Sequence, residues 1–182
     1  MLYHRQHSFT FDAAATTTIV GTRAFGFASN GASTKETSMQ VQPYLFFNGR
    51  CEEALKFYGD KLGAEVIFQM RFKDAPPNPQ QPIRPGTENK IMHCTFRIGS
   101  TELMASDGNC DETPGTHTGY GLSITVDDPS QGETTFNAMA DGGNVVMPWQ
   151  PTFWSTGFGM VVDRFGVMWM ITNPHDGDKH PS

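Results

Sequence analysis

Two titratable side chains in the middle of the chain have the chemistry of acid–base catalysts. His93 carries an imidazole, which exchanges a proton near neutral pH and can also bind a metal ion. Glu102 carries a carboxylate, which can serve as a general base. These two residues are the candidate catalytic residues. The alternative roles are a hydrogen-bonded structural histidine and a solvated glutamate at a strand end.

Side chains suited to ligand binding alternate along the first strongly apolar segment. Gln42, Tyr44 and Phe46 share one face if this segment is extended. The amide and the phenol can orient a ligand by hydrogen bonding, and the phenyl ring can pack on it; ordinary strand packing explains the same pattern equally well. Methionine and tryptophan side chains can line an apolar cavity or fill a core. The further candidate substrate-binding residues of this kind are Met104, Trp154, Met168 and Met170.

The composition excludes several functional classes. A net charge of -6 leaves no basic surplus to neutralise nucleic-acid phosphates. The basic residues are scattered and the apolar runs are too short to span a bilayer, so we predict neither nucleic acid nor a membrane as partner. Cys51, Cys94 and Cys110 lack CxxC spacing, which argues against a disulfide framework or a structural zinc site. A soluble protein of the reducing cytoplasm fits these features.

The first patterned half of the chain predicts one helix among four strands. Alternation predicts a strand over Gln40–Phe47, and helical spacing of apolar residues follows over Arg50–Leu62, with Asn48 close enough to cap it and Gly63 at its end. Residues 75–90 form a Pro/Gln/Asn-rich loop without periodicity. The other strands of this half are predicted at Glu65–Phe72, Ile91–Ile98 and Glu102–Ala105.

The second half repeats this order. Asp128 and Pro129 form a strong helix start, and the helix runs to about Ala140. Asp163 begins a turn that ends at Gly166. The strands are predicted at Gly121–Val126, Asn144–Trp149, Gly157–Val162 and Val167–Thr172. The matching order indicates an internal duplication of plan.

The predicted fold class is therefore α+β, with two βαβββ modules forming curved mixed sheets around a shared cavity, which is a natural small-molecule site. The modules are expected at about residues 39–110 and 119–175, with a tail at 176–182. Residues 1–38 are rich in Thr, Ala, Ser and Gly and lack periodicity. They are interpreted as a disordered extension or as a start codon assigned too early, with Met39 as the natural start.

Several motifs in this order resemble one known family. The chain resembles the PhnB-like branch of the vicinal-oxygen-chelate (glyoxalase/bleomycin-resistance) superfamily, whose members are sometimes labelled 3-demethylubiquinone-9 3-methyltransferase domains. The resemblance covers about residues 39–175. The matching stretches are Pro43–Gly49, Glu53–Tyr58, Met92-His93, Ile98-Gly99, Met104–Asp107, Phe153-Trp154 and Gly159–Ile171.

The resemblance implies a fold, a homodimer and a ligand cavity, but not one reaction. Metal-dependent members of the superfamily place one ligand on each of four strands. The matching positions here are near Gln42 or Pro43, within Glu102–Ser106, near Gly121 and at Met170. Glycine and methionine do not supply the imidazole or carboxylate ligands of such sites. We therefore predict no metal and no cofactor.

The methyltransferase label lacks the residues to carry it. A Rossmann-type methyltransferase holds its cofactor at a glycine-rich turn between a strand and a helix. The Gly157-Phe158-Gly159 sequence stands instead at the start of a predicted strand. We discount that activity.

The predicted function is a metal-independent small-molecule-binding protein of this superfamily, with the question of catalysis left open. One alternative is a metal-dependent lyase, isomerase or dioxygenase that recruits Gln42, His93 and Glu102. The other is a resistance protein that sequesters an aromatic drug, which the Trp, Phe and Met content favours.

Overall fold

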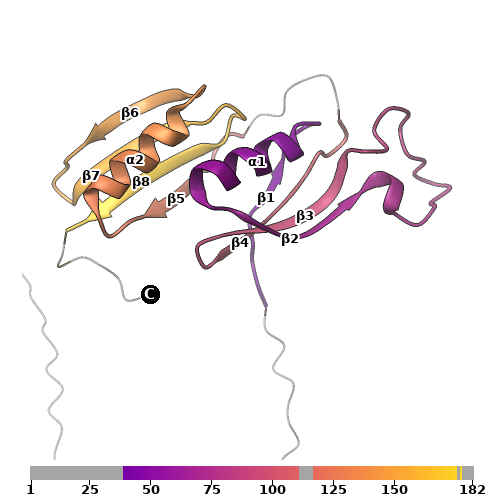
Figure 1. The fold of residues 1–182 in the computed structure, drawn as a ribbon, viewed down its shortest axis with the longest axis horizontal. Helices are drawn as coiled ribbons and strands as arrows, with labels where there is room; N and C mark the ends of the chain where they lie inside the picture. The colour runs from indigo at the N-terminus through magenta and orange to yellow at the C-terminus, as the bar shows by residue number, and fades with distance from the viewer. Residues whose placement is uncertain (1–38, 111–116, 176, 178–182) are drawn as a thin grey trace, which may run out of the picture. The chain divides into compact units, whose positions relative to one another are not determined.

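The computed structural model describes residues 39–110, 117–175 and 177, which form two modules of the same plan (Figure 1). The predicted extension at residues 1–38 and most of the predicted tail at 176–182 lie outside the described residues. The elements in order are β1 (Tyr44–Phe46), α1 (Cys51–Leu62), β2 (Glu65–Arg71), a 3-10 turn (Phe72–Asp74), β3 (Ile91–Ile98), β4 (Thr101–Ser106), β5 (Leu122–Thr125), α2 (Pro129–Ala140), β6 (Asn144–Gln150), β7 (Ser155–Val162) and β8 (Met168–Pro174).

Each module contributes one four-stranded mixed sheet. In sheet A the strand order is β1-β4-β3-β2, and in sheet B it is β5-β8-β7-β6. The first strand of each module runs parallel to the last strand, and the remaining pairs are antiparallel. The identical order confirms the predicted α+β fold with two βαβββ modules.

The helix ends show where local prediction was right and where it was wrong. The side chain of Asp128 accepts a hydrogen bond from Ser130 N at 2.9 Å, as the predicted cap requires. Arg50, rather than Asn48, stands at the N-cap of α1, without a side-chain cap, and Asn48 occupies a turn with φ of 51°. The Cys51 N–H donates instead to the carboxylate of Asp107 at 2.7 Å.

The first strand is shorter than predicted. Alternation suggested a strand from residue 40, yet β1 begins at Tyr44. Pro43 has no N–H to donate, so it cannot continue a ladder toward the N-terminus. Its carbonyl still accepts a hydrogen bond from Met104 N at 2.9 Å, which fixes the register of β1 against β4.

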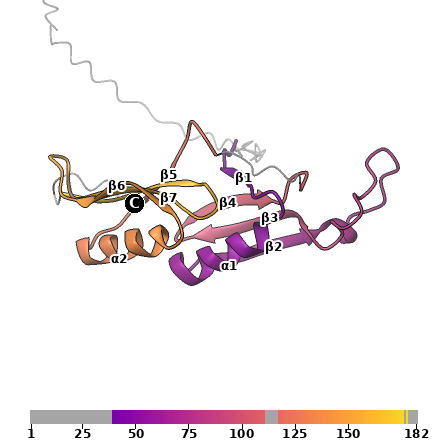
Figure 2. The same cartoon turned by 90° about the horizontal axis from the view of Figure 1, so that it is seen from above.

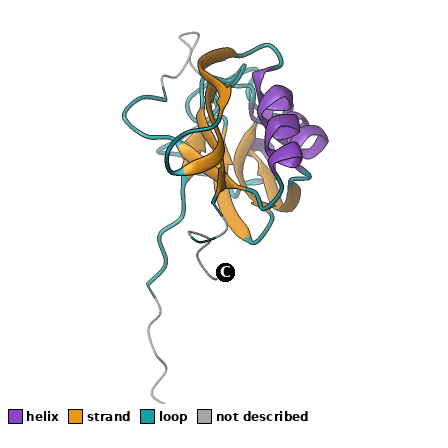
Figure 3. Cartoon of the chain, turned by 90° about the vertical axis from the view of Figure 1, so that its left-hand side faces the viewer, coloured by secondary structure: helices purple, strands orange, loops and turns teal. Residues whose placement is uncertain are grey.

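Both helices lie against the same side of the strands, which leaves the other side of each sheet free of helices (Figures 2 and 3). The helix-covered faces form one buried core that includes residues of both modules. Burying each large apolar side chain of this kind contributes about 1.5–3 kcal/mol. Members with at most 2% exposure include Leu45, Tyr58, Phe96, Met139, Val161, Trp169 and Ile171.

A buried carboxylate joins the two modules. Asp163, which is 3% exposed, accepts hydrogen bonds from Tyr58 Oη of α1 at 2.7 Å and from Trp169 Nε1 of β8 at 2.9 Å. Its other oxygen accepts from the N–H groups of Phe165 and Val167, each at 2.9 Å, which confirms the predicted turn. Burial and the neighbouring carboxylate raise the pKa of Tyr58, so its hydroxyl remains a donor.

The two glycines of the Gly157-Phe158-Gly159 sequence lie within β7 and serve packing. A Cβ on Gly157 would stand 2.1 Å from Cζ2 of Trp149, and one on Gly159 would stand 2.7 Å from Cδ2 of Phe136. The aromatic rings therefore require glycine at both positions. β7 continues through these glycines to Val162 and is paired along its length, so they are not a strand-to-helix turn of the kind that holds a nucleotide.

Candidate functional site

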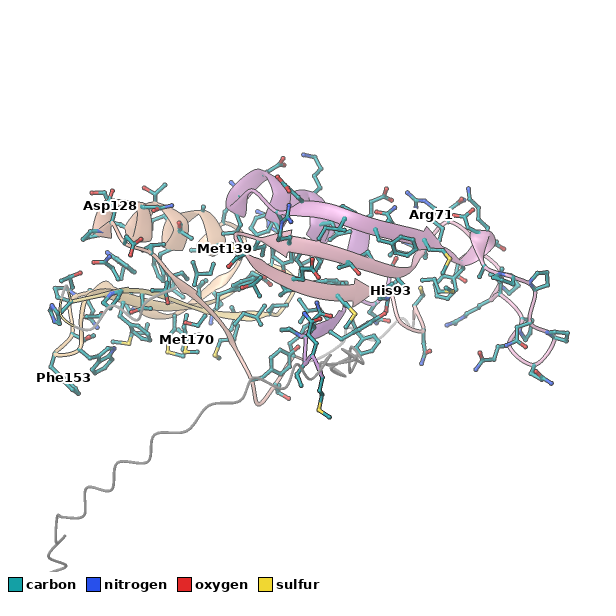
Figure 4. All side chains as sticks on the ribbon, turned by 90° about the horizontal axis from the view of Figure 1, so that it is seen from below. Arg71, His93, Asp128, Met139, Phe153 and Met170 are labelled. Atoms are coloured by element: carbon teal, nitrogen blue, oxygen red, sulfur yellow. The ribbon has the colours of Figure 1, made fainter. Side chains whose placement is uncertain are left out.

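The helix-free side of sheet A, called here the open face of sheet A, collects most of the predicted site residues, among them His93, which Figure 4 labels. The register places Tyr44 beside Met104, and Met104 beside Thr95, so these three side chains point the same way. His93 lies two residues before Thr95 on β3 and shares that direction. The residues of the open face of sheet A are Gln42, Tyr44, Phe46, Phe68, Met70, His93, Thr95, Arg97, Glu102 and Met104.

A phenol–imidazole pair stands at the centre of this face. The Tyr44 hydroxyl lies 3.1 Å from His93 Nδ1, within hydrogen-bond distance. This bond occupies one ring nitrogen and fixes the ring, so Nε2 is the nitrogen that can meet a ligand. The Phe46 ring lies 4.9 Å from that of Tyr44, and the Phe68 ring lies 6.1 Å from that of His93. The pair is therefore flanked by aromatic rings.

These flanking rings are open to solvent. Phe46 is 56% exposed and Phe68 is 50% exposed, although both are large and apolar. Phe68 was missed by the sequence reasoning, because β2 alternates weakly and contains a register shift between Val66 and Phe68. Exposed aromatic rings beside a hydrogen-bonding pair mark a surface suited to a flat ligand.

Glu102 lies on the same face but away from His93. Its carboxylate accepts a hydrogen bond from the Gln42 amide at 3.2 Å, and its register partner is Arg97 rather than His93. Four residues of extended strand separate positions 93 and 97, a span of about 13 Å. The two predicted catalytic residues are therefore too far apart to act as a pair on one atom. Together with Glu65 and Arg97, Glu102 lines a polar hollow of about 650 Å³.

The other predicted ligand-binding residues lie on the helix-free side of sheet B. Met170 is the register partner of Ser123 and Met160, so these side chains share a face, and Met168 lies two residues earlier on the same strand. Trp154 stands just before β7, with its ring 5.8 Å from that of Phe158. The structure thus divides the predicted site residues between the two sheets. The open face of sheet B comprises Ser123, Thr125, Met147, Phe158, Met160, Met168, Met170 and Thr172.

The donor set does not fit the metal site of the metal-dependent superfamily members. The Gln42 amide is bonded to Glu102, Gly121 packs against Met168, and position 170 offers a thioether. Within residues 39–110 and 117–175, no group of three or more His, Cys, Asp or Glu side chains is placed to hold a metal ion. A hard divalent cation would find too few oxygen and imidazole ligands here.

Two residues outside the open faces have defined partners. Asp107 begins a turn, in which the Cys110 N–H donates to its carbonyl at 3.2 Å, and its buried carboxylate accepts hydrogen bonds from the main-chain N–H groups of Cys51 and Ile91, each at 2.7 Å. His117 lies with Nδ1 2.5 Å from the Tyr120 hydroxyl. Burial lowers the pKa of His117.

The thiols offer no nucleophile on either open face. Cys51 and Cys94 are fully buried, with their Sγ atoms 3.8 Å apart. The contact with Cys94 and then burial raise the pKa of Cys51, so it remains a protonated thiol. Cys94 lies in the core and Cys110 in a loop.

Comparison with known proteins settles the family. The family model described as 3-demethylubiquinone-9 3-methyltransferase matches residues 39–172. The chain belongs to this family. Protein YjdN of Escherichia coli strain K12 is 34% identical to the chain over 139 residues, which are 73% of this chain and 94% of YjdN.

Solved structures of similar proteins support the same assignment. The chain is 41% identical to protein PA1353 from Pseudomonas aeruginosa, with a TM-score of 0.64 and coverage of 75% of this chain and 98% of that one. It is 28% identical to a PhnB protein from Bacillus cereus, described as a putative 3-demethylubiquinone-9 3-methyltransferase, with a TM-score of 0.62 and coverage of 74% and 99%.

The family places the chain in the vicinal-oxygen-chelate superfamily, as the motifs predicted. A glyoxalase-related enzyme from Fulvimarina pelagi shares the fold at 18% identity, with a TM-score of 0.50 and coverage of 75% of this chain and 88% of that one. In the described part of the chain, neither helix has the length and apolar character needed to cross a bilayer.

Proposed function

We propose that this chain is a metal-independent small-molecule-binding protein and that its ligand site is the open face of sheet A. The observation that carries the proposal is the Tyr44–His93 pair, with a hydroxyl-to-nitrogen distance of 3.1 Å. A tyrosine and a histidine held together among exposed aromatic rings provide hydrogen-bonding groups where a ligand can reach them.

The surroundings of the pair favour a flat apolar ligand with one polar group. Phe46 and Phe68 offer ring faces for stacking, and such contacts are worth about 0.5–1.5 kcal/mol each beyond area burial. The polar group would meet Nε2 of His93 or the hydroxyl of Tyr44. The flexible, apolar side chain of Met104 lies on the same face, between the Tyr44–His93 pair and Glu102.

The metal-independent part of the proposal rests on the donor set. Gln42 and Glu102 are bonded to each other, and the thioether of Met170 occupies the position of a hard ligand. The methyltransferase description of the family adds no support for methyl transfer here, because Gly157 and Gly159 pack against aromatic rings.

The proposal extends to the assembly and setting of the protein. We place the ligand site in a homodimer, where a second copy would enclose the site beside the exposed aromatic residues, and we place the protein in the cytoplasm, where cysteine thiols stay reduced. The functional domain is residues 39–175, and residues 1–38 are an extension with no part in binding.

A catalytic role would use the same pair. His93 would act as the acid or base, with Tyr44 holding its ring, and Glu102 would act only on a group at the far end of the ligand. A second candidate function is sequestration of an aromatic drug, which the methionine-rich open face of sheet B with Trp154 and Phe158 favours.

The test uses 2-naphthol, a flat apolar probe with one hydroxyl, titrated calorimetrically into the chelator-treated protein. We expect saturable binding that Tyr44→Phe weakens by about fivefold to tenfold, the value of one lost hydrogen bond. Tyr120→Phe is the matched control, because it removes the hydroxyl of the other tyrosine–histidine pair, His117–Tyr120. Equal affinity in the wild type and Tyr44→Phe, or no saturable binding by the wild type, contradicts the proposed site.

A further inference from the structure

Thr95 lies in the middle of the open face of sheet A and is half-buried there. Its side chain points to this face, because its neighbours on β3, Cys94 and Phe96, are fully buried in the core. Within the described part of the chain, the Thr95 hydroxyl has no hydrogen-bond partner. A threonine hydroxyl both donates and accepts, so this one is available to a bound molecule.

The neighbours of Thr95 across the sheet are apolar. The register pairs it with Phe68 on β2 and with Met104 on β4. A phenyl ring offers no conventional hydrogen-bonding atom, and a thioether is only a weak acceptor. A strong partner for the hydroxyl must therefore come from outside the sheet.

The other polar side chains of the open face of sheet A already have side-chain partners. These pairs are Tyr44 with His93 at 3.1 Å, Gln42 with Glu102 at 3.2 Å, and Arg97 with Glu65 at 2.7 Å. Thr95 is therefore the position on this face at which a ligand has to supply the missing partner.

A flat ligand that reaches His93 and stacks beside Phe68 also covers Thr95. Thr95 follows His93 by two residues on the same strand, a distance of about 7 Å, and it is the register partner of Phe68. Covering a hydroxyl with apolar surface takes it out of water without replacing the lost hydrogen bond, which weakens binding. A ligand with a second polar group about 7 Å from the first avoids this loss.

We propose that Thr95 determines the ligand class of this site: a flat molecule with two polar groups, one meeting the Tyr44–His93 pair and the other meeting the Thr95 hydroxyl. This role of Thr95 rests on the proposed ligand site on the open face of sheet A, and it adds a second polar group to the one that the pair requires. A ligand without that group is selected against, because it leaves the covered hydroxyl unpaired.

The experiment titrates 2-naphthol and 2,7-dihydroxynaphthalene calorimetrically into the chelator-treated full chain and compares the ratio of their affinities. The two probes share one ring system, and the diol carries a second hydroxyl at its far end. We expect the wild type to bind the diol about tenfold more tightly than 2-naphthol, because one further hydrogen bond forms. Two equivalent hydroxyl groups give about twofold by statistics alone, so a tenfold ratio requires a second contact.

The variant Thr95→Val keeps the branched shape of the side chain and removes the hydroxyl. The affinity ratio should fall to about twofold, because the second contact of the diol is lost. The variant should bind 2-naphthol at least as tightly as the wild type does, because valine needs no hydrogen-bond partner when it is covered.

The matched control is Thr172→Val, which changes another half-buried threonine, on the open face of sheet B, and should keep the wild-type ratio. A ratio of about twofold in the wild type, an equal ratio in the wild type and Thr95→Val, or an equal fall in both variants overturns the role of Thr95. Each of these results is compatible with 2-naphthol binding that Tyr44→Phe weakens, so the proposed site would stand. If neither probe binds the wild type saturably, the proposed site is overturned, and the role of Thr95 with it.

Discussion

The two sheets share a plan but present different chemistry on their open faces. On sheet A, the open face carries a phenol, an imidazole, an amide and a carboxylate. One hydrogen bond joins the side chains of Tyr44 on β1 and His93 on β3, and another joins Gln42, which precedes β1, to Glu102 on β4. On sheet B, the corresponding face carries four methionines and Phe158. The helix-covered faces, by contrast, merge into one core. Duplication has therefore kept the packing and let the exposed surfaces diverge.

This contrast explains why one face is assigned to recognition and the other to apolar contact. Hydrogen-bonding groups held at fixed distances select a ligand, since an unmatched partner leaves them unpaired. Methionine side chains adapt to many shapes and select little. We therefore propose the site on sheet A, with sheet B as the broader apolar surface.

The core shared by the two modules should be most sensitive to a substitution at Asp163. Each oxygen of the Asp163 carboxylate accepts two hydrogen bonds, so the NH2 group of Asp163→Asn must face donors in the core whichever oxygen it replaces. We expect the free energy of unfolding to fall by about 3 kcal/mol, measured by chemical denaturation. Asp127→Asn, at an exposed position, should change it by less than about 0.5 kcal/mol. A similarly small loss in Asp163→Asn would mean that this carboxylate does not join the modules.

The affinity of variants for 2-naphthol tests the difference between the two open faces. His93→Ala removes the imidazole and should weaken binding by about tenfold, whereas Met170→Ala should change the affinity by no more than about twofold. The double variant Tyr44→Phe/His93→Ala should bind no more weakly than His93→Ala, because the two residues act as one pair. A larger effect of Met170→Ala than of His93→Ala would move the site to sheet B.

The thiols test how tightly the covered side of sheet A is packed. A thiol reagent should modify Cys110 in the native protein and leave Cys51 and Cys94 unmodified until the protein unfolds, because both are fully buried. Mass spectrometry of trapped peptides gives the order of modification. Native-state labelling of Cys94 as fast as Cys110 would contradict the packed core beneath the open face.

The smallest effect concerns pH and the His117–Tyr120 pair. Burial lowers the pKa of His117 in the folded state, so the unfolded chain binds the proton more readily. The stability contributed by neutral His117 is present above about pH 6.5, its unfolded value, and is lost as the pH falls through and below it. His117→Asn should therefore flatten the decline in unfolding free energy over this acid range, measured by denaturation at several pH values. If the unfolding free energy of His117→Asn falls with pH as steeply as that of the wild type, burial of this imidazole does not contribute to the pH dependence of stability.

Periodicity and helix-end signals predicted the modules because they are local. The cap at Asp128 and the turn at Asp163 each depend on residues close in sequence, and both are confirmed. The bond from Cys51 N to Asp107 joins positions 56 residues apart, so no local pattern could reveal it.

The residues of the proposed site could be listed from the sequence, but their arrangement could not. Alternation placed Gln42, Tyr44 and Phe46 on one face, as the structure shows. The Tyr44–His93 contact depends on β4 lying between β1 and β3, and the separation of His93 from Glu102 depends on the register of β3 with β4. Strand order and register are set by the whole sheet, so sequence reasoning could list these residues without pairing them.

The most direct test of the central claim is to map 2-naphthol binding on the chelator-treated, isotopically labelled protein by nuclear magnetic resonance. We predict saturable chemical-shift changes centred on Tyr44, Phe46 and His93, with small changes along β7 and β8, and the same affinity when divalent metal is added back. Changes confined to β7 and β8, or binding that appears only with metal, would contradict a metal-independent site on the open face of sheet A.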